Sequence, residues 1–160
     1  MGFDIDYNVN NESFVQFKIA QTIDNTTGYN QSLLGSTGFI SRLTVDRRSS
    51  LGWFYRFMFN YTGEDFEPGI GFVRTTNTAD YYASTGYGWI APESSAIERH
   101  RVQIRNYSIQ SYKGFNLRSR YVNFSWNTNF KLAGSLDSEL VYRQEHLLDD
   151  EDFYLLSRIY

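Results

Sequence analysis

The chain has 160 residues, enough for one domain, and a formal net charge of −3. This acidic balance argues against a general nucleic-acid binder, which usually presents a basic surface. The absence of cysteine excludes disulfides, thiolate zinc sites and thiol nucleophiles. The absence of any run of about 18 apolar residues excludes a transmembrane helix.

Apolar and polar side chains alternate with a period of two along most of the chain, which predicts β-strands. The first run alternates apolar residues with aspartates and an asparagine. The clearest run, 51–61, has a leucine or an aromatic residue at every second position, with Phe54 and Met58 as apolar exceptions on the opposite face. In chain order, the expected strands cover residues 3–9, 15–19, 39–45, 51–61, 81–89, 99–113, 121–130, 132–143 and 153–160.

The run at 99–113 changes face along its length. Val102 and Ile104 lie on one face, whereas Tyr107 and Ile109 lie on the other. This change predicts either a β-bulge or a strand that continues beyond a bilayer, and the sequence leaves both open.

Turn-forming residues separate the runs. Two longer polar loops are expected, at 24–35 and 63–74, and residues 149–152 form an acidic loop. Asn and Gly tolerate positive φ, so dipeptides that contain them predict tight hairpins. These dipeptides are Asn10-Asn11, Lys113-Gly114 and Ala133-Gly134. Short turns at one end and long loops at the other are typical of membrane barrels.

Strand length indicates the fold class. Several runs have about 10 to 14 residues, whereas strands of globular proteins usually have about five or six. A tilted strand of about 9–11 residues crosses the hydrocarbon of a membrane. Alternation also keeps mean hydropathy low, here −0.47, because the second face is polar. We therefore expect an all-β, antiparallel up-and-down transmembrane β-barrel, or part of a larger one, with roughly eight or nine strands visible.

Aromatic residues make up 18% of the chain and gather at the ends of the runs. Membrane barrels carry aromatic girdles at their two interfaces. The expected interfacial residues are Trp53, Tyr61, Trp89 and Trp126. The alternative fold is a soluble up-and-down barrel or sandwich, whose core would use the same alternation with shorter strands and fewer aromatic residues.

These expectations lead to a location and a function. Residues 1–160 are expected to form one barrel region of a bacterial outer membrane, in contact with the lipid bilayer. The region would serve as a structural, pore or transport-related segment without catalysis of its own. No signal peptide is visible after Met1, although an outer-membrane barrel needs one, so we expect a piece of a longer chain. The alternative function is a soluble β-domain that binds carbohydrate.

The segment from Gly63 to Arg74, with the sequence GEDFEPGIGFVR, resembles a motif in a Bacteroidota-type family of unknown function. Full-length members of that family carry an N-terminal domain similar to family 9 carbohydrate-binding modules, followed by a large β-barrel. The resemblance implies a barrel, with glycans or other envelope proteins as partners. The chain departs from the family pattern at Thr75, where a second basic residue is common, and it contains nothing that corresponds to the carbohydrate-binding domain.

The same segment predicts a structured loop. Its glycines permit close backbone approach, Pro68 stiffens the turn, and Arg74 is expected to pair with Asp65 or Glu67. Two roles for these residues are consistent with the sequence, namely anchoring of the loop and contact with a ligand. The residues of this loop motif are Gly63, Asp65, Phe66, Pro68, Gly71, Phe72 and Arg74.

Candidate chemistry elsewhere is sparse. Arg99, Arg101 and Arg105 share one strand face and are expected to line a lumen. His100 and His146 are the only histidines and lie on distant runs, so we expect no metal site. No carboxylate pair has the setting of a general acid, and no cofactor is expected.

Overall fold

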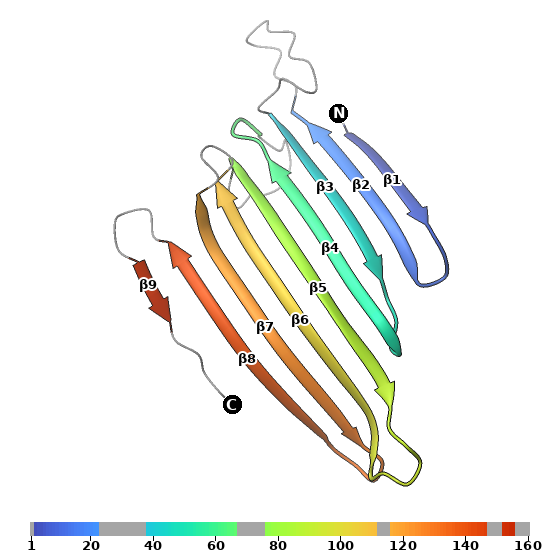
Figure 1. The fold of residues 1–160 in the computed structure, drawn as a ribbon. Coiled ribbons are helices and arrows are strands. Elements are labelled where there is room, and N and C mark those ends of the chain that lie inside the picture. The colour runs from blue at the N-terminus through green and yellow to red at the C-terminus, as the bar shows by residue number, and fades with distance from the viewer. Residues whose placement is uncertain (1, 23–37, 67–75, 112–115, 147–151, 156–160) are drawn as a thin grey trace, which may run out of the picture.

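The structure, a computed structural model, describes residues 2–22, 38–66, 76–111, 116–146 and 152–155, the last range by its backbone alone. The described residues form a single antiparallel sheet (Figure 1). They contain no helix long and apolar enough to cross a membrane.

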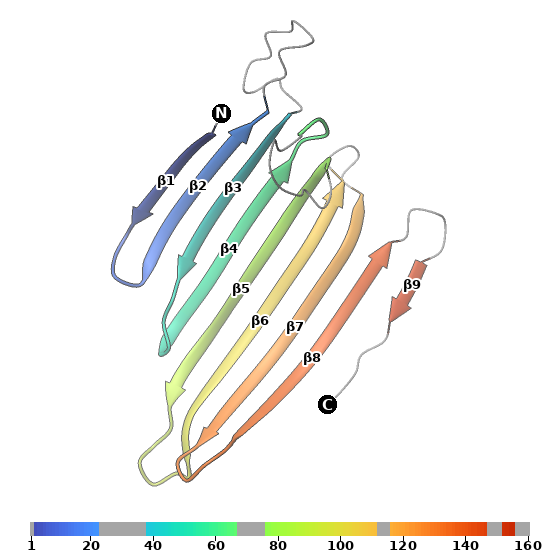
Figure 2. The same ribbon diagram turned by 180° about the vertical axis from the view of Figure 1, so that it is seen from behind.

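Nine strands follow one another in the sheet in the order in which they occur in the sequence. They are β1 Gly2–Asn8, β2 Ser13–Gln21, β3 Phe39–Arg47, β4 Gly52–Thr62, β5 Thr78–Ile90, β6 Ile97–Ser111, β7 Leu117–Phe130, β8 Ser135–His146 and β9 Asp152–Leu155. Each pairs antiparallel with the next, which confirms the predicted all-β, up-and-down arrangement. The sheet is not closed, since β1 and β9 form its two edges (Figures 1 and 2). Barrel closure and a membrane location therefore remain predictions.

The central strands are long. Strands β4 to β8 contain 11 to 15 residues each, about twice the usual strand length in globular proteins. The pairing of β6 is continuous from Arg99 to Ile109, and its register shifts only near its ends. No bulge separates Ile104 from Tyr107, so the change of face predicted for this strand is real, and Tyr107 lies on the opposite side of the sheet.

Register places the apolar side chains of neighbouring strands together. Directly paired residues of an antiparallel sheet lie on the same side, so Phe17, Leu43, Phe59 and Tyr81 form one row across four strands. We call this side the apolar face. Its apolar members include Phe3, Ile5, Tyr7, Val15, Phe17, Ile19, Phe39, Leu43, Val45, Trp53, Tyr55, Phe57, Phe59, Tyr61, Ala79, Tyr81, Ala83, Tyr87, Trp89, Val102, Ile104, Val122, Phe124, Trp126, Leu136, Leu140 and Tyr142.

The opposite side, the polar face, carries charged, amide and hydroxyl side chains from β1 to β8. Its main members are Asp4, Asp6, Gln16, Lys18, Arg42, Thr44, Asp46, Arg56, Asn60, Asp80, Ser84, Arg99, Arg101, Gln103, Arg105, Asn123, Ser125, Asn127, Asp137, Glu139 and Arg143. Phe54 and Met58 also lie there, as their positions in the sequence predict.

Burial on the two faces is reversed relative to a water-soluble domain. On the apolar face Trp53 is 60% exposed and Phe57 40%, whereas on the polar face Asp46 is 3% exposed and Ser84 8%. Side chains converge on the concave side of a single-layer sheet, so this asymmetry indicates that the sheet curves toward its polar face. Phe54, the large apolar side chain that is buried among the described residues, lies on that side.

Connection length differs between the two ends of the sheet. At one end, the short-turn end, the four connections have four to six residues. At the other, the long-loop end, the connections after β2 and β4 have 17 and 15 residues, and the two later ones have five each. The expected contrast between short turns and long loops therefore holds for the connections after β2 and β4 only. The loop at 24–35 and the turn at Lys113-Gly114 lie outside the described residues.

Turn geometry corrects one prediction. In the described residues Asn77 is the non-glycine residue with positive φ, so the Asn10-Asn11 turn does not use that conformation. The Asn10 side chain instead accepts a hydrogen bond from the Glu12 backbone N–H at 2.9 Å, the short-range bond that favours Asn in turns. Gly134 has a φ of 97°, as expected for its turn.

Candidate functional site

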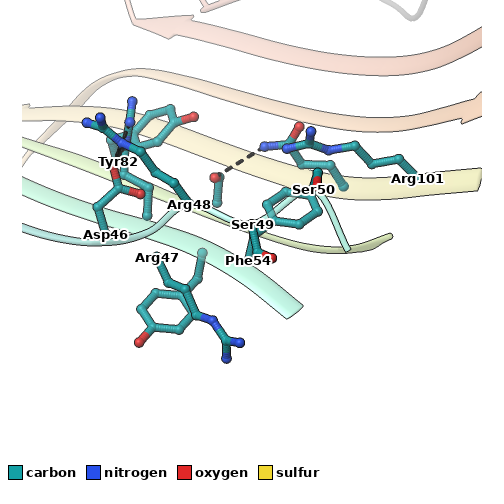
Figure 3. A pocket seen from close by; sticks show the side chains of 12 residues that line it. Asp46, Arg47, Arg48, Ser49, Ser50, Phe54, Tyr82 and Arg101 are labelled. Atoms are coloured by element: carbon teal, nitrogen blue, oxygen red, sulfur yellow. Dashed lines mark hydrogen bonds and ion pairs between the residues drawn. The ribbon is translucent and has the colours of Figure 1, made fainter. Parts of the chain in front are cut away.

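A hollow lies on the polar face at the short-turn end of the sheet (Figure 3). It has a volume of about 420 Å³ and is formed by β3, β4, β5, β6 and the turn between β3 and β4. We call it the basic hollow. Its lining residues on the polar face and in the turn are Asp46, Arg48, Ser49, Ser50, Phe54, Arg56, Tyr82, Ser84, Arg101 and Gln103. Arg47 and Tyr55, which lie on the apolar face, also border it.

A buried carboxylate holds two arginines at one side of this hollow. Asp46 and Arg56 face each other across β3 and β4. Asp46 Oδ2 accepts from Arg56 Nη2 at 2.6 Å and Nε at 2.9 Å, and from Arg48 Nε at 3.0 Å. Such charge-assisted bonds are the stronger hydrogen bonds of proteins, so they fix the two guanidinium groups in place.

Loss of the arginine and loss of the carboxylate should have different costs in stability. Arg56→Ala leaves the buried Asp46 carboxylate with only the exposed Arg48, so we expect a loss of about 2 kcal/mol or more in unfolding free energy. Asp46→Asn leaves two partly exposed guanidinium groups that water can solvate, and should cost less than about 1 kcal/mol. Denaturant titration of both variants checks the order, and an equal cost would show that Asp46 is not effectively buried.

Arg101, on β6, lies at the other side of the hollow. Its guanidinium carbon is 3.9 Å from the centroid of the Phe54 ring, a cation–π contact. Phe54 in turn packs on Gly86 of the neighbouring strand. Among the described residues Arg101 has no carboxylate partner. The ring thus positions a guanidinium that forms no ion pair within the described part of the chain.

The three arginines predicted to line a lumen do share one face of β6, and each has a different partner. Arg101 lies over Phe54. Arg105 Nη2 lies 3.6 Å from Glu139 Oε1. Arg99 donates to the Asn129 amide oxygen once that amide is oriented toward it. Their common face is confirmed, and a lumen in front of them remains a prediction.

A second, smaller hollow of about 210 Å³ continues from the first toward β8. It shares Arg101 and Gln103 with the basic hollow and adds acidic side chains from β8. Beside it, Asn123 is fully buried, and its amide has no hydrogen-bond partner within the described part of the chain. The polar face therefore offers a continuous hydrophilic surface from β3 to β8.

Sequence reasoning missed the pairing of Asp46 with Arg56. Their register is centred on Leu51, the last residue of the turn at 48–51, so a hairpin symmetric about that turn would not place them opposite each other. Asn123 lies in a predicted strand among other polar residues, and no sequence signal distinguishes it from them.

All four predicted interfacial aromatics lie on the apolar face. Three of them, Trp53, Trp89 and Trp126, belong to a belt of ring contacts at the short-turn end. The ring centroids are 5.4 Å apart for Trp53 and Tyr87, 5.0 Å for Trp89 and His100, and 5.9 Å for His100 and Trp126. Trp126 Nε1 also donates to His100 Nδ1 at 3.3 Å. We call these residues the short-turn belt.

A second group of rings, the long-loop belt, lies near the other end of the same face. Tyr61, the fourth predicted residue, is 4.8 Å from Phe39, and Phe59 is 5.1 Å from Tyr81, measured between ring centroids. The apolar face therefore has aromatic rings at both ends, and their use at membrane interfaces remains a prediction.

The loop motif is described only in its first part. The Gly63 N–H donates to the Phe39 carbonyl at 2.8 Å, which extends the β3–β4 pairing by one bond. Asp65 is exposed in the turn that follows, and Phe66 is partly buried. The other motif residues, Pro68, Gly71, Phe72 and Arg74, lie outside the described residues, as does Glu67, so the predicted pairing of Arg74 remains untested.

Metal binding has no support in the described residues, where no group of three potential ligands is clustered. His100 lies on β6 and His146 on β8, with β7 between them.

No protein-family model, curated protein or solved structure matches the chain. The resemblance to a Bacteroidota-type family therefore remains a prediction from the sequence.

Proposed function

We propose that the sheet is part of the wall of a transmembrane β-barrel in a bacterial outer membrane. The apolar face would contact lipid and the polar face would line the lumen, so the region serves as a structural, pore or transport-related segment without catalysis of its own. The observation that carries this proposal is the reversed burial, with large apolar side chains exposed on one face and polar side chains, among them the charged Asp46, buried on the other.

The exposed face is the first support. Soluble proteins expose single apolar residues freely, but contiguous exposed apolar patches mark interaction surfaces. Here the apolar side chains continue from β1 to β8 in one layer. Lipid tails would cover all of them at once. Membrane barrels show the same division, with apolar side chains on the lipid-facing outside and polar side chains facing the lumen.

The spacing of the aromatic belts is the second support. Trp53 and Tyr61 lie eight residues apart on β4, and Tyr81 and Trp89 lie eight apart on β5. At roughly 3.3 Å per residue this is about 26 Å along each strand. A strand tilt of about 40° reduces the height to about 20 Å, close to the apolar band of about 25 Å in outer-membrane barrels.

Heat-modifiable gel mobility tests the proposal on the chain in its native context. We expect the protein to fractionate with the outer membrane, to require detergent for extraction, and to migrate differently before and after boiling. Because a barrel wall owes its stability to many strand pairs, Trp89→Ala should retain the mobility shift. A protein that remains soluble without detergent and shows no shift would contradict the proposal.

The second candidate is a soluble β-domain that binds carbohydrate through the exposed rings of the short-turn belt. It predicts retention on a glycan column, which Trp89→Ala and Trp126→Ala would abolish. The barrel wall predicts no such loss, so the two functions give opposite results with the same variants.

A further inference from the structure

We propose that the basic hollow binds a small solute through an oxyanion group, either a phosphate or a carboxylate, with Arg101 as the principal ligand. The inference goes beyond the proposed barrel wall and does not depend on a bilayer, since it rests on the side chains of the hollow alone.

The charge of the hollow is the first argument. Arg48, Arg56 and Arg101 contribute three guanidinium groups from the polar face and the adjoining turn, whereas Asp46 is the acidic residue among those that line it. Asp46 already accepts from both Arg48 and Arg56. An excess of positive charge therefore remains, and an anion would reduce it.

The setting of Arg101 is the second argument. Contact with the Phe54 ring holds its guanidinium in one orientation, and Phe54 is itself buried against Gly86. A guanidinium that is held in place loses less freedom when it forms the paired hydrogen bonds that phosphates and carboxylates accept. Figure 3 shows Arg101 and Phe54 at one side of the hollow, with Asp46 and Tyr82 at the other.

The third argument is a neutral hydrogen-bonding group in the hollow, the Ser84 hydroxyl. Gln103 Nε2 donates to Ser84 Oγ at 3.3 Å, so the Ser84 hydroxyl can direct its own hydrogen toward a bound oxygen. Ser84 is buried and lines the hollow. The hollow, at about 420 Å³, lies within the usual size range of small-molecule sites, which suits a phosphate ion or an acidic monosaccharide.

Isothermal titration of the purified full protein at low ionic strength tests the proposal, with inorganic phosphate, D-glucuronate and neutral D-glucose as probes. We expect phosphate or glucuronate to bind and glucose not to bind. Binding of phosphate alone would identify a phosphate site, and binding of glucuronate alone would identify a carboxylate site. If neither anion binds, the proposal is wrong.

Two substitutions should change anion affinity in opposite directions. Arg101→Gln should weaken binding about tenfold, as expected for loss of one charge-assisted contact. Asp46→Asn should strengthen it severalfold, because it removes the negative charge that now neutralises Arg48 and Arg56. If Asp46→Asn does not fold, Arg48→Gln in the exposed turn replaces it and should weaken binding.

Arg143→Gln is the matched control. Arg143 also lies on the polar face near an aromatic ring, with 6.0 Å between its guanidinium carbon and the Tyr121 ring centroid, but it is outside both hollows. Equal losses in Arg101→Gln and Arg143→Gln would overturn the proposal, since they would indicate a general charge effect. A soluble protein that still binds the anion would end the barrel proposal and leave this one standing.

Discussion

Arginine substitutions along β4 should destabilise the protein most at the middle of the apolar face. Relative to alanine at the same position, we expect Phe57→Arg to cost about 2–4 kcal/mol, and Trp53→Arg and Tyr61→Arg about 0–1 kcal/mol. The reason is depth: the central position would place the guanidinium among lipid tails, whereas the end positions let it reach the headgroups. Urea titration of the protein folded into lipid vesicles measures the profile.

The neighbouring residue provides a matched control. Met58 follows Phe57 in the sequence but lies on the polar face, where it pairs with Thr44 and Tyr82. Met58→Arg should therefore cost much less than Phe57→Arg, even though the two residues share the same depth. An equal cost at Met58, or a profile without a central maximum, would argue that the apolar face packs against protein instead of lipid.

The fold was predictable because alternation is a local signal. A run such as 51–61 shows from its own residues which side chains share a face, and the nine expected runs correspond to the nine strands. The ends of the runs were less accurate. Backbone hydrogen bonds continue past the apolar pattern, so β2 begins at Ser13 instead of Val15. The predicted start of β8 at Leu132 was too early, because Leu132 lies in the turn and is almost fully exposed.

The site was predictable only within single strands. Arg99, Arg101 and Arg105 share a face because they are separated by even numbers of residues, and one strand is enough to see this. The partners of these arginines come from neighbouring strands and depend on register. Phe54 beneath Arg101 is the clearest case, since the two residues are 47 positions apart and meet only through β4, β5 and β6.

The turns illustrate the same limit. Asn10-Asn11 marked a hairpin correctly, but the stabilising contact is a side-chain bond to the Glu12 N–H and not a left-handed backbone. Residue type predicted the position of the turn. The backbone conformation of the turn depends on the number of residues in the connection, which also fixes the register.

Gly86→Ala should destabilise the protein by about 3 kcal/mol, the upper end of the usual cost of overpacking. A Cβ at position 86 would overlap both the Phe54 ring and the Val102 carbonyl oxygen. The carbonyl belongs to the β5–β6 ladder and cannot move without breaking its hydrogen bonds. Replacement of a strand glycine by alanine ordinarily stabilises a protein slightly by restricting the unfolded chain, so the sign of the effect is itself diagnostic. Thermal or denaturant unfolding measures it.

Two further variants separate the two overlaps at Gly86. Ala83→Val adds bulk to the exposed, apolar face of the same strand and should change stability by less than about 0.5 kcal/mol. Phe54→Leu combined with Gly86→Ala removes the ring overlap but leaves the carbonyl overlap, so it should recover only part of the loss. Full recovery would show that the ring alone excludes a side chain at position 86. A stable Gly86→Ala variant would contradict the close packing of Phe54 on β5, and with it the platform that holds Arg101.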